Sequence, residues 1–314
     1  MCLRFVVVVS SLYDHCHRSS ESQWGMPSMS DRRSALLFHS PLVRVFDVTC
    51  DAPQSGCDRE EYCSVTQIVV PRRGAFLLHH QGTPIVADLN TALIFGMGDT
   101  YQISHPVDGG DRCTVLVFRP ELVEDALGNV KIQHGTIHPV TQLNIHVLTH
   151  RIANGVLDQL EAEEGAVFVL SDLAKDFKSS SPLSSQRVNK FQQRRVEGVR
   201  ALLSSRPTDP WHLESIARTV YCSPFHLARQ FRTVTGESIG HYLLRLRLAL
   251  ALDRLAQGET ELARLAVELG FAHHSHFSAR FRSVFGMTPT AVRNTLTHRG
   301  FQQMSKILTA KPRT

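Results

Sequence analysis

Apolar residues between positions 40 and 120 come in short runs separated by turn-forming residues. The runs read VRVFDVTC, VTQIVV, AFLLHH, TALIFG and CTVLVF, and between them lie PRRG, QGTP, GMGD and HPVDGG. Short strands rich in β-branched and aromatic residues, at near-regular spacing, are typical of an antiparallel barrel or sandwich. The pattern predicts β-structure throughout this segment.

The period of the apolar residues becomes helical from Thr141 to about Lys178. Residues four apart lie along one stripe of a helix, and here the stripe consists of Leu148, Ile152, Val156 and Leu160. Two interpretations of this stripe are open: it mediates dimerisation, or it packs on the β-structure that precedes it.

A Ser-rich segment with one proline, KSSSPLSSQ, follows at Lys178–Gln186 and has no apolar period. Such a composition is typical of an interdomain linker. We therefore expect a leader over residues 1–35, an N-terminal domain over 36–178, a linker over 179–192, a second domain over 193–300 and a tail over 301–314.

Helix signals dominate the chain after this linker. Ser238–Gln257 is rich in Leu and Ala, and Gly258 ends it, which predicts one long helix. Capping residues, several of them followed by proline, predict the other helix starts. These starts are Asp209-Pro210, Ser223-Pro224, Thr260 and Thr288-Pro289.

Two copies of one short motif lie on either side of the long helix. FHLARQFRTVTG (Phe225–Gly236) and SHFSARFRSVFG (Ser275–Gly286) share the pattern H-x₄-F-R-x-V-x-G, with every shared position shifted by 50 residues. A helix containing a small residue, Ala217 or Ala266, precedes each copy after a short turn. Small residues allow two helices to cross closely, so each copy predicts a helix-turn-helix.

The second helix of such a unit enters the major groove of DNA. Arg229 suits a guanine edge, Phe225 a thymine methyl group, and Arg232 a phosphate. A solvated helix face is the alternative for either copy alone, but two copies in register favour DNA binding. The candidate DNA-binding residues are Ser223, Phe225, His226, Ala228, Arg229 and Arg232, and then His274, Ser275, His276, Ala279, Arg280 and Arg282.

The charge of the chain is divided unevenly. Residues from Arg187 onward hold 20 Lys/Arg and 8 Asp/Glu, a formal charge of +12, against −7 for residues 1–186. This asymmetry favours a polyanion-binding module joined to a domain with another task.

The long helix of about 20 residues spans roughly 30 Å, close to the ~34 Å repeat of B-DNA. It would therefore place the second helix of each helix-turn-helix, here called a reading helix, in successive major grooves.

These motifs resemble one known family. SIARTVYCSPFHLARQFRTVTGESIGHYLLRLRLALAL and ELARLAVELGFAHHSHFSARFRSVFGMTPTAVR are similar to the DNA-binding domain of the AraC/XylS transcription regulators. The resemblance implies a seven-helix, two-headed domain that binds promoter DNA, commonly as an activator that contacts RNA polymerase. Family members often carry Arg at the position of Ala279, so this chain departs there from the base-reading pattern that the resemblance implies for the second unit.

The segment before this domain is similar in layout to the small cupin-like barrels that sense effectors in many members. The resemblance implies an unknown small-molecule effector, with helices after the barrel that dimerise in the arabinose-type members. The expected fold class is α+β: a cupin-like antiparallel β-barrel plus helices, then an all-α domain with two helix-turn-helix units joined by a long helix.

Metal and catalytic sites are weakly signalled. His79 and His80 are adjacent and would point to opposite faces of a strand. A cluster of Cys50, Cys57, Cys63 and His105 would make a thiol or metal sensor, although unpaired cysteines are more often small buried hydrophobes. We expect no enzyme, no catalytic residue, no metal and no cofactor. The alternative is a cupin-type metalloenzyme or a metal or thiol sensor fused to a DNA-targeting domain.

Seven cysteines at irregular spacing predict reduced thiols, as in a cytoplasmic protein. The apolar run at Phe5–Val9 is too short to cross a bilayer, so no membrane partner is expected.

Overall fold

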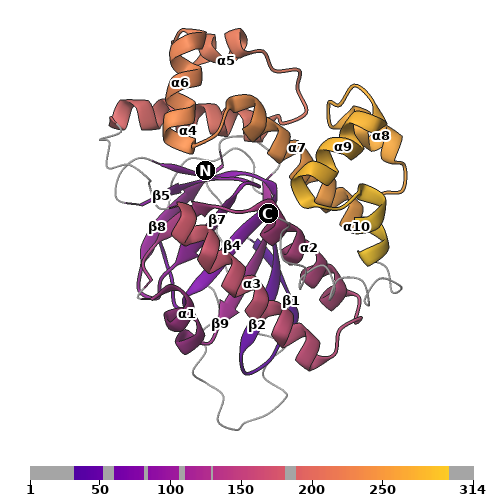
Figure 1. Cartoon of the computed structure of the whole chain (residues 1–314). Coiled ribbons are helices and arrows are strands. Elements are labelled where there is room, and N and C mark those ends of the chain that lie inside the picture. Colours follow the sequence, from indigo (N-terminus) through magenta and orange to yellow (C-terminus); the bar gives the residue numbers. More distant parts are fainter. Residues whose placement is uncertain are drawn as a thin grey trace.

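The computed structural model describes residues 32–51, 60–80, 84–105, 110–128, 130–180 and 189–296. Strands come first and helices follow (Figure 1). The strands are β1 (Arg32–His39), β2 (Val43–Cys50), β3 (Glu60–Tyr62), β4 (Gln67–Gly74), β5 (Phe76–His79), β6 (Ile85–Ala87), β7 (Thr91–Phe95), β8 (Thr100–Ser104), β9 (Asp111–Phe118) and β10 (Gln133–Thr136).

Two antiparallel sheets form the N-terminal domain. One sheet has six strands in the order β1-β2-β9-β4-β7-β10, and the other has four in the order β3-β8-β5-β6. Alternate residues of β2 face opposite sides of its sheet: Val43 and Val45 lie in one apolar cluster, whereas Phe46 and Val48 lie in another. The second cluster also contains Phe76 of β5, so it fills the space between the two sheets.

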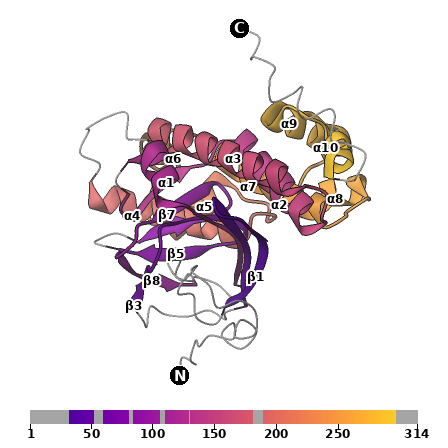
Figure 2. The same cartoon turned by 90° about the horizontal axis from the view of Figure 1, so that it is seen from below.

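Three helices cover the outer face of the six-stranded sheet: α1 (Pro120–Leu127), α2 (Pro139–Ala153) and α3 (Gln159–Ser180). Figure 2 shows α2 and α3 lying across that side of the strands. The N-terminal domain therefore has three layers, namely helices, a six-stranded sheet and a four-stranded sheet.

The single helical stripe predicted after Thr141 is wrong, because the chain breaks between two helices. Gly155 adopts a left-handed φ of 63° in the break, a conformation that glycine reaches without strain. Leu148 and Ile152 of α2 are buried against the sheet, whereas Leu160 of α3 is 64% exposed. The part of the stripe that lies on α2 therefore packs on its own domain.

Seven helices follow within the described residues, as the family resemblance implied. They are α4 (Lys190–Ser205), α5 (Leu213–Thr219), α6 (Pro224–Thr235), α7 (Ile239–Ala256), α8 (Leu262–Glu268), α9 (His274–Phe285) and α10 (Pro289–Leu296). The predicted caps at Ser223 and Thr288 are confirmed, since their side chains accept hydrogen bonds from the backbone N–H groups of His226 and Ala291, three residues further on. Ser238, at the predicted start of the long helix, accepts one from His241 in the same way. The predicted starts at Asp209 and Thr260 are wrong: α5 begins after His212 and α8 after Glu261.

The domain limits in the structure differ from the expected ones by a few residues. Strand β1 begins at Arg32, inside the segment 1–35 expected to be a leader. Helix α3 continues to Ser180 and α4 begins at Lys190, so both enter the expected linker over 179–192. The tail over 301–314 lies outside the described residues. Among the described helices, none combines the length and the apolarity needed to cross a membrane.

Candidate nucleic-acid interface

The first helix-turn-helix consists of α5 and α6. Ile216 and Ala217 of α5 pack against Leu227 and Phe231 of α6, and all four are buried. Tyr221 in the turn has a positive φ of 50° and a side chain that is 93% exposed. The apolar positions thus fix α6 by one face and leave its other face open to solvent.

The open face of α6 carries the residues predicted to meet DNA. Phe225 is 72% exposed on this face. Its ring lies 5.7 Å from the ring of His226, centre to centre. The remaining predicted residues of this unit are also exposed, namely Ser223, Ala228, Arg229 and Arg232.

The second helix-turn-helix consists of α8 and α9 and repeats this arrangement. Leu265 and Ala266 pack against Phe277 and Phe281, all of them buried. The predicted DNA-binding residues of this unit are all exposed on α9: His274, Ser275, His276, Ala279, Arg280 and Arg282.

Two side-chain contacts lie on the exposed face of α9. His274 Nε2 lies 3.3 Å from the hydroxyl of Ser278, and Arg280 Nε lies 3.4 Å from His276 Nε2. Arg280 therefore leans toward His276, and the exposed face of α9 offers hydroxyl and imidazole groups where α6 offers Arg229.

Among the exposed arginines whose guanidinium groups form no ion pair with a carboxylate in the described part of the chain are Arg229, Arg232 and Arg282. An exposed arginine without an intramolecular partner keeps its donors for phosphate or base edges. Arg232 and Arg282 occupy matching places, one on each reading helix.

Helix α7 joins the two units, which lie at its opposite ends (Figure 1). Its 18 residues span about 27 Å at ~1.5 Å per residue. Arg247 near its middle donates to the carbonyls of Pro207 and Asp209, each over 2.8 Å, and to that of Gly270 over 3.2 Å. Arg247 thereby ties the loop before α5 to the turn between α8 and α9, and burial lowers its pKa.

A buried polar cluster joins the two domains. Arg200 of α4 donates to the carbonyl of Val86 over 2.9 Å and to the hydroxyl of Thr91 over 2.8 Å. Its Nη1 lies 3.0 Å from Glu197, which also accepts from the Val86 backbone N–H over 2.9 Å. We call this set, completed by Asp88, Ser204 and Tyr242, the interdomain cluster.

Asp88 is fully buried and accepts hydrogen bonds from the hydroxyl groups of Ser204 and Tyr242. Burial alone would lower the pKa of Arg200, but Glu197, Tyr242 and Asp88 raise it well above its ordinary value. Burial raises the pKa of Tyr242, which keeps its hydroxyl a donor. The cluster is therefore a hydrogen-bonded unit in which one guanidinium faces two carboxylates.

Apolar contacts also join the N-terminal domain to each of the two helix-turn-helix units. Leu89, next to Asp88, is 1% exposed and packs in the core around Phe231 of the first unit. Leu143 and Val147 of α2 pack in the core around Phe281 of the second unit. Each helix-turn-helix thus completes its core with residues from the N-terminal domain.

Sequence reasoning missed Arg200, Arg247 and Asp88. Arg247 lies in RLRLAL, where a charged residue inside an otherwise apolar run signals a buried partner. Neither Asp88 nor Arg200 stands out locally, because their partners in the other domain lie more than 100 residues away in the chain.

The predicted cluster of Cys50, Cys57, Cys63 and His105 is only partly formed. Cys63 lies apart, donates to the carbonyl of Val65 over 2.9 Å, and burial raises its pKa to about 11. Cys57 lies outside the described residues. Cys50 and His105 do come together, and Asp111 joins them.

Comparison with known proteins agrees with this geometry. The family model described as "Helix-turn-helix domain" matches residues 216–295. SoxS of Escherichia coli (strain K12) is 31% identical over 104 residues, which cover 33% of this chain and 97% of SoxS. YidL, an HTH-type transcriptional regulator of the same strain, is 36% identical over 108 residues, 34% of this chain.

The chain matches only 36% of the length of YidL. A solved structure of ToxT from Vibrio cholerae aligns over 82% of this chain and 99% of that one, with 13% identity and a TM-score of 0.33. Two helix-turn-helix units joined by a long helix define a class of transcription regulator. The chain belongs to the AraC family of these regulators.

Proposed function

We propose that the chain binds promoter DNA sequence-specifically through α6 and α9 and activates transcription by contact with RNA polymerase. One observation carries this proposal: two helices with matching exposed faces lie at the ends of α7, each fixed by the same buried positions. Arg229 would read a guanine edge, and Arg232 and Arg282 would hold phosphates. The relatives named above, SoxS and YidL, are regulators, which supports a role other than catalysis.

The N-terminal domain is proposed to sense a small-molecule effector. The interdomain cluster supports this role, because β6 and the turn after it are hydrogen-bonded to α4 and α7. A ligand that displaced this turn would shift helices on which the first reading helix packs. Helix α3 exposes Leu160 and Phe168, at 64% and 62%, which supports a homodimer formed through this helix. Such a regulator would act in the cytoplasm, where promoter DNA lies.

A second candidate, a metal- or thiol-responsive regulator, is favoured by the meeting of Cys50, His105 and Asp111. It differs from the first only in the nature of the effector.

Selection of binding sites from random-sequence DNA tests the DNA-binding proposal. The full-length protein should enrich one sequence, and its affinity should fall steeply with salt because counterions are released. The matched control is the double variant Arg229→Ala, Arg282→Ala, which changes two exposed side chains, should bind more weakly and should lose the preference at the base pair that Arg229 reads. Enrichment of the same sequence by that control, or of none by the wild type, would contradict the proposal.

Repeating the binding measurement with candidate effectors tests the sensing role. A true effector should raise the melting temperature by mass action and change the occupancy of the selected site.

A further inference from the structure

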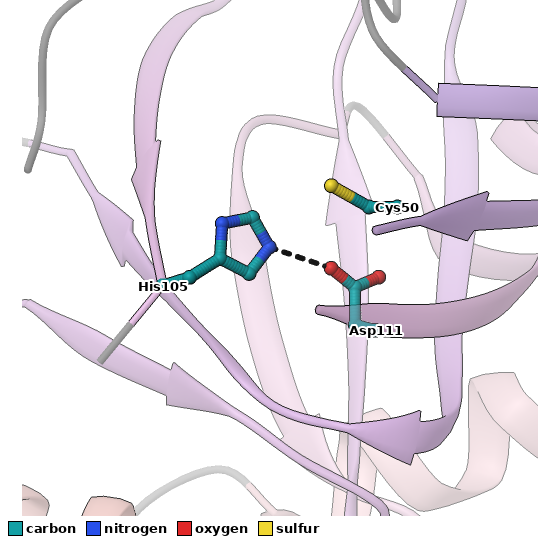
Figure 3. Close-up of side chains that lie close together, drawn as sticks. All are labelled: Cys50, His105 and Asp111. Carbon is teal, nitrogen blue, oxygen red and sulfur yellow. Dashed lines mark hydrogen bonds and ion pairs between the residues drawn. The ribbon is translucent and has the colours of Figure 1, made fainter. Parts of the chain in front are cut away.

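Three side chains from different strands converge at one end of the space between the two sheets. Cys50 ends β2 and pairs directly with Asp111, which begins β9. His105 follows β8 of the other sheet. Figure 3 shows all three side chains directed toward one small region. One ligand atom from each lies within 4.8 Å of the others.

These groups are withdrawn from water. The side chains of His105 and Asp111 are 4% and 2% exposed, and His105 Nε2 lies 2.8 Å from Asp111 Oδ1. Cys50 is 1% exposed. Burying a carboxylate, an imidazole and a thiol together is costly unless they neutralise one another or bind a cation. An apolar trio would fill the same space at lower cost, so the choice of these three needs a chemical reason.

The donor set matches one class of ion. Thiolate, imidazole and carboxylate are the ligands of Zn²⁺, whereas Mg²⁺ and Ca²⁺ take oxygen ligands. Metal–ligand distances of about 2.0–2.3 Å in a tetrahedral site place the donors roughly 3.3–3.8 Å from each other. The observed separations, up to 4.8 Å, reach that geometry with small side-chain rotations. We propose that Cys50, His105 and Asp111 bind one Zn²⁺ ion.

Cys113 offers a further thiol on the same face of β9. Cys113 follows Asp111 by two residues, so both point to the inner side of the sheet. Its Sγ lies 3.1 Å from Asp111 Oδ2, and it is buried. Cys113 is not one of the three mutually close donors, so it would complete four protein ligands, as in structural zinc sites, only by turning toward them.

An ion at this position would connect the two sheets of the N-terminal domain. Cys50, Asp111 and Cys113 belong to the six-stranded sheet, whereas His105 continues β8 of the four-stranded sheet. A shared Zn²⁺ would fasten one sheet to the other at this end. Strand β8 pairs with β5, and β5 pairs with β6, whose Val86 contacts Arg200 in the interdomain cluster. The ion would therefore restrain the sheet that touches the DNA-binding domain.

Metal binding by the full-length protein tests this proposal. Protein stripped by a chelator should take up one Zn²⁺ per chain, and its melting temperature should rise. Co²⁺ in the same place should give the near-ultraviolet absorption of a thiolate-to-Co²⁺ charge transfer. Cys50→Ser, His105→Gln and Asp111→Asn should each weaken binding by at least about tenfold, since loss of even an outer partner costs about 10–100-fold.

Cys63→Ser is the matched control, because Cys63 is as buried as Cys50 but donates its hydrogen bond to the carbonyl of Val65. It should bind Zn²⁺ as the wild type does. The Co²⁺ spectrum of the wild type tests the site even if a variant fails to fold. Absence of thiolate absorption with Co²⁺, or unchanged affinity in Cys50→Ser and Asp111→Asn, would overturn the proposal and leave a buried ion pair beside a thiol.

Discussion

Arg200 of α4 donates a hydrogen bond from Nη2 to the backbone carbonyl of Val86 in β6, over 2.9 Å. The two residues belong to different domains, and the contact is buried with Asp88 and Tyr242 around it. A strand of the N-terminal domain thus holds the helix that begins the DNA-binding region. We regard this contact as the route by which the two domains influence each other.

Arg200→Met should destabilise the protein by about 3–5 kcal/mol, because it leaves Asp88 and Glu197 buried without their cation. Urea unfolding followed by circular dichroism measures this loss. Arg194→Met is the control on the exposed side of the same helix and should change stability by less than about 0.5 kcal/mol. Equal effects of the two variants would show that the interdomain cluster contributes nothing specific.

Arg229→Ala should cost about 1–3 kcal/mol of binding free energy and relax preference at one base pair, as loss of a bidentate base contact does. Arg282→Ala should weaken all sequences alike and lower the salt dependence by about one unit of slope. Ala279→Arg should add a contact or a new preference in the second groove. Binding to a library of single-base variants of the selected site distinguishes these results. Uniform weakening by Arg229→Ala would assign that residue to the DNA backbone.

Arg247→Ala should reduce the affinity for a DNA site that both helix-turn-helix units contact by at least about tenfold, since the two units lose their fixed relative position. Base preference should not change. The guanidinium of Arg247 joins Pro207 and Asp209 to Gly270. Arg264→Ala removes the same charge from the exposed side of α8 and should have little effect. Titrations of both variants on the selected site provide the comparison, and similar losses in both would refute the bridging role.

His146 of α2 should make the fold sensitive to acid. Burial, with the charges of Arg72 and Arg112, lowers its pKa to about 3 from an unfolded value near 6.5. Between these two pKa values His146 is protonated in the unfolded chain and neutral in the folded chain, so the free energy of unfolding falls as the pH drops from about 6.5 toward 3. Between pH 7.5 and 5 the wild type should lose about 2 kcal/mol more than His146→Asn does. His226→Asn, at an exposed position, should behave as the wild type, and equal pH dependence in all three proteins would contradict the assignment.

Much of the fold was predictable because the signals are local. The strands β2 and β7 and the caps at Ser223 and Ser238 follow from short patterns, and so do the two reading helices. The break at Gly155 was missed because the apolar period continues across it. Strands β3 and β6, of three residues each, are too short to show a pattern.

The exposure of the candidate DNA-binding residues was predictable from helical geometry alone, since each motif fixes which positions are buried. The partners of Arg200 and of Cys50 were not, because strand order brings together residues far apart in the chain. Asp111 lies opposite Cys50 only through the pairing of β2 with β9, which no local pattern specifies.

Hydroxyl-radical footprinting of the full-length protein on its selected site tests most directly whether one chain reads DNA with two heads. The account predicts two protected blocks on one face of the duplex, with centres about one helical turn, 10–10.5 base pairs, apart. Arg229→Ala should weaken protection more in the block that α6 contacts than in the block that α9 contacts. A single block of the width of one helix-turn-helix, unchanged in extent by variants on α9, would contradict the account.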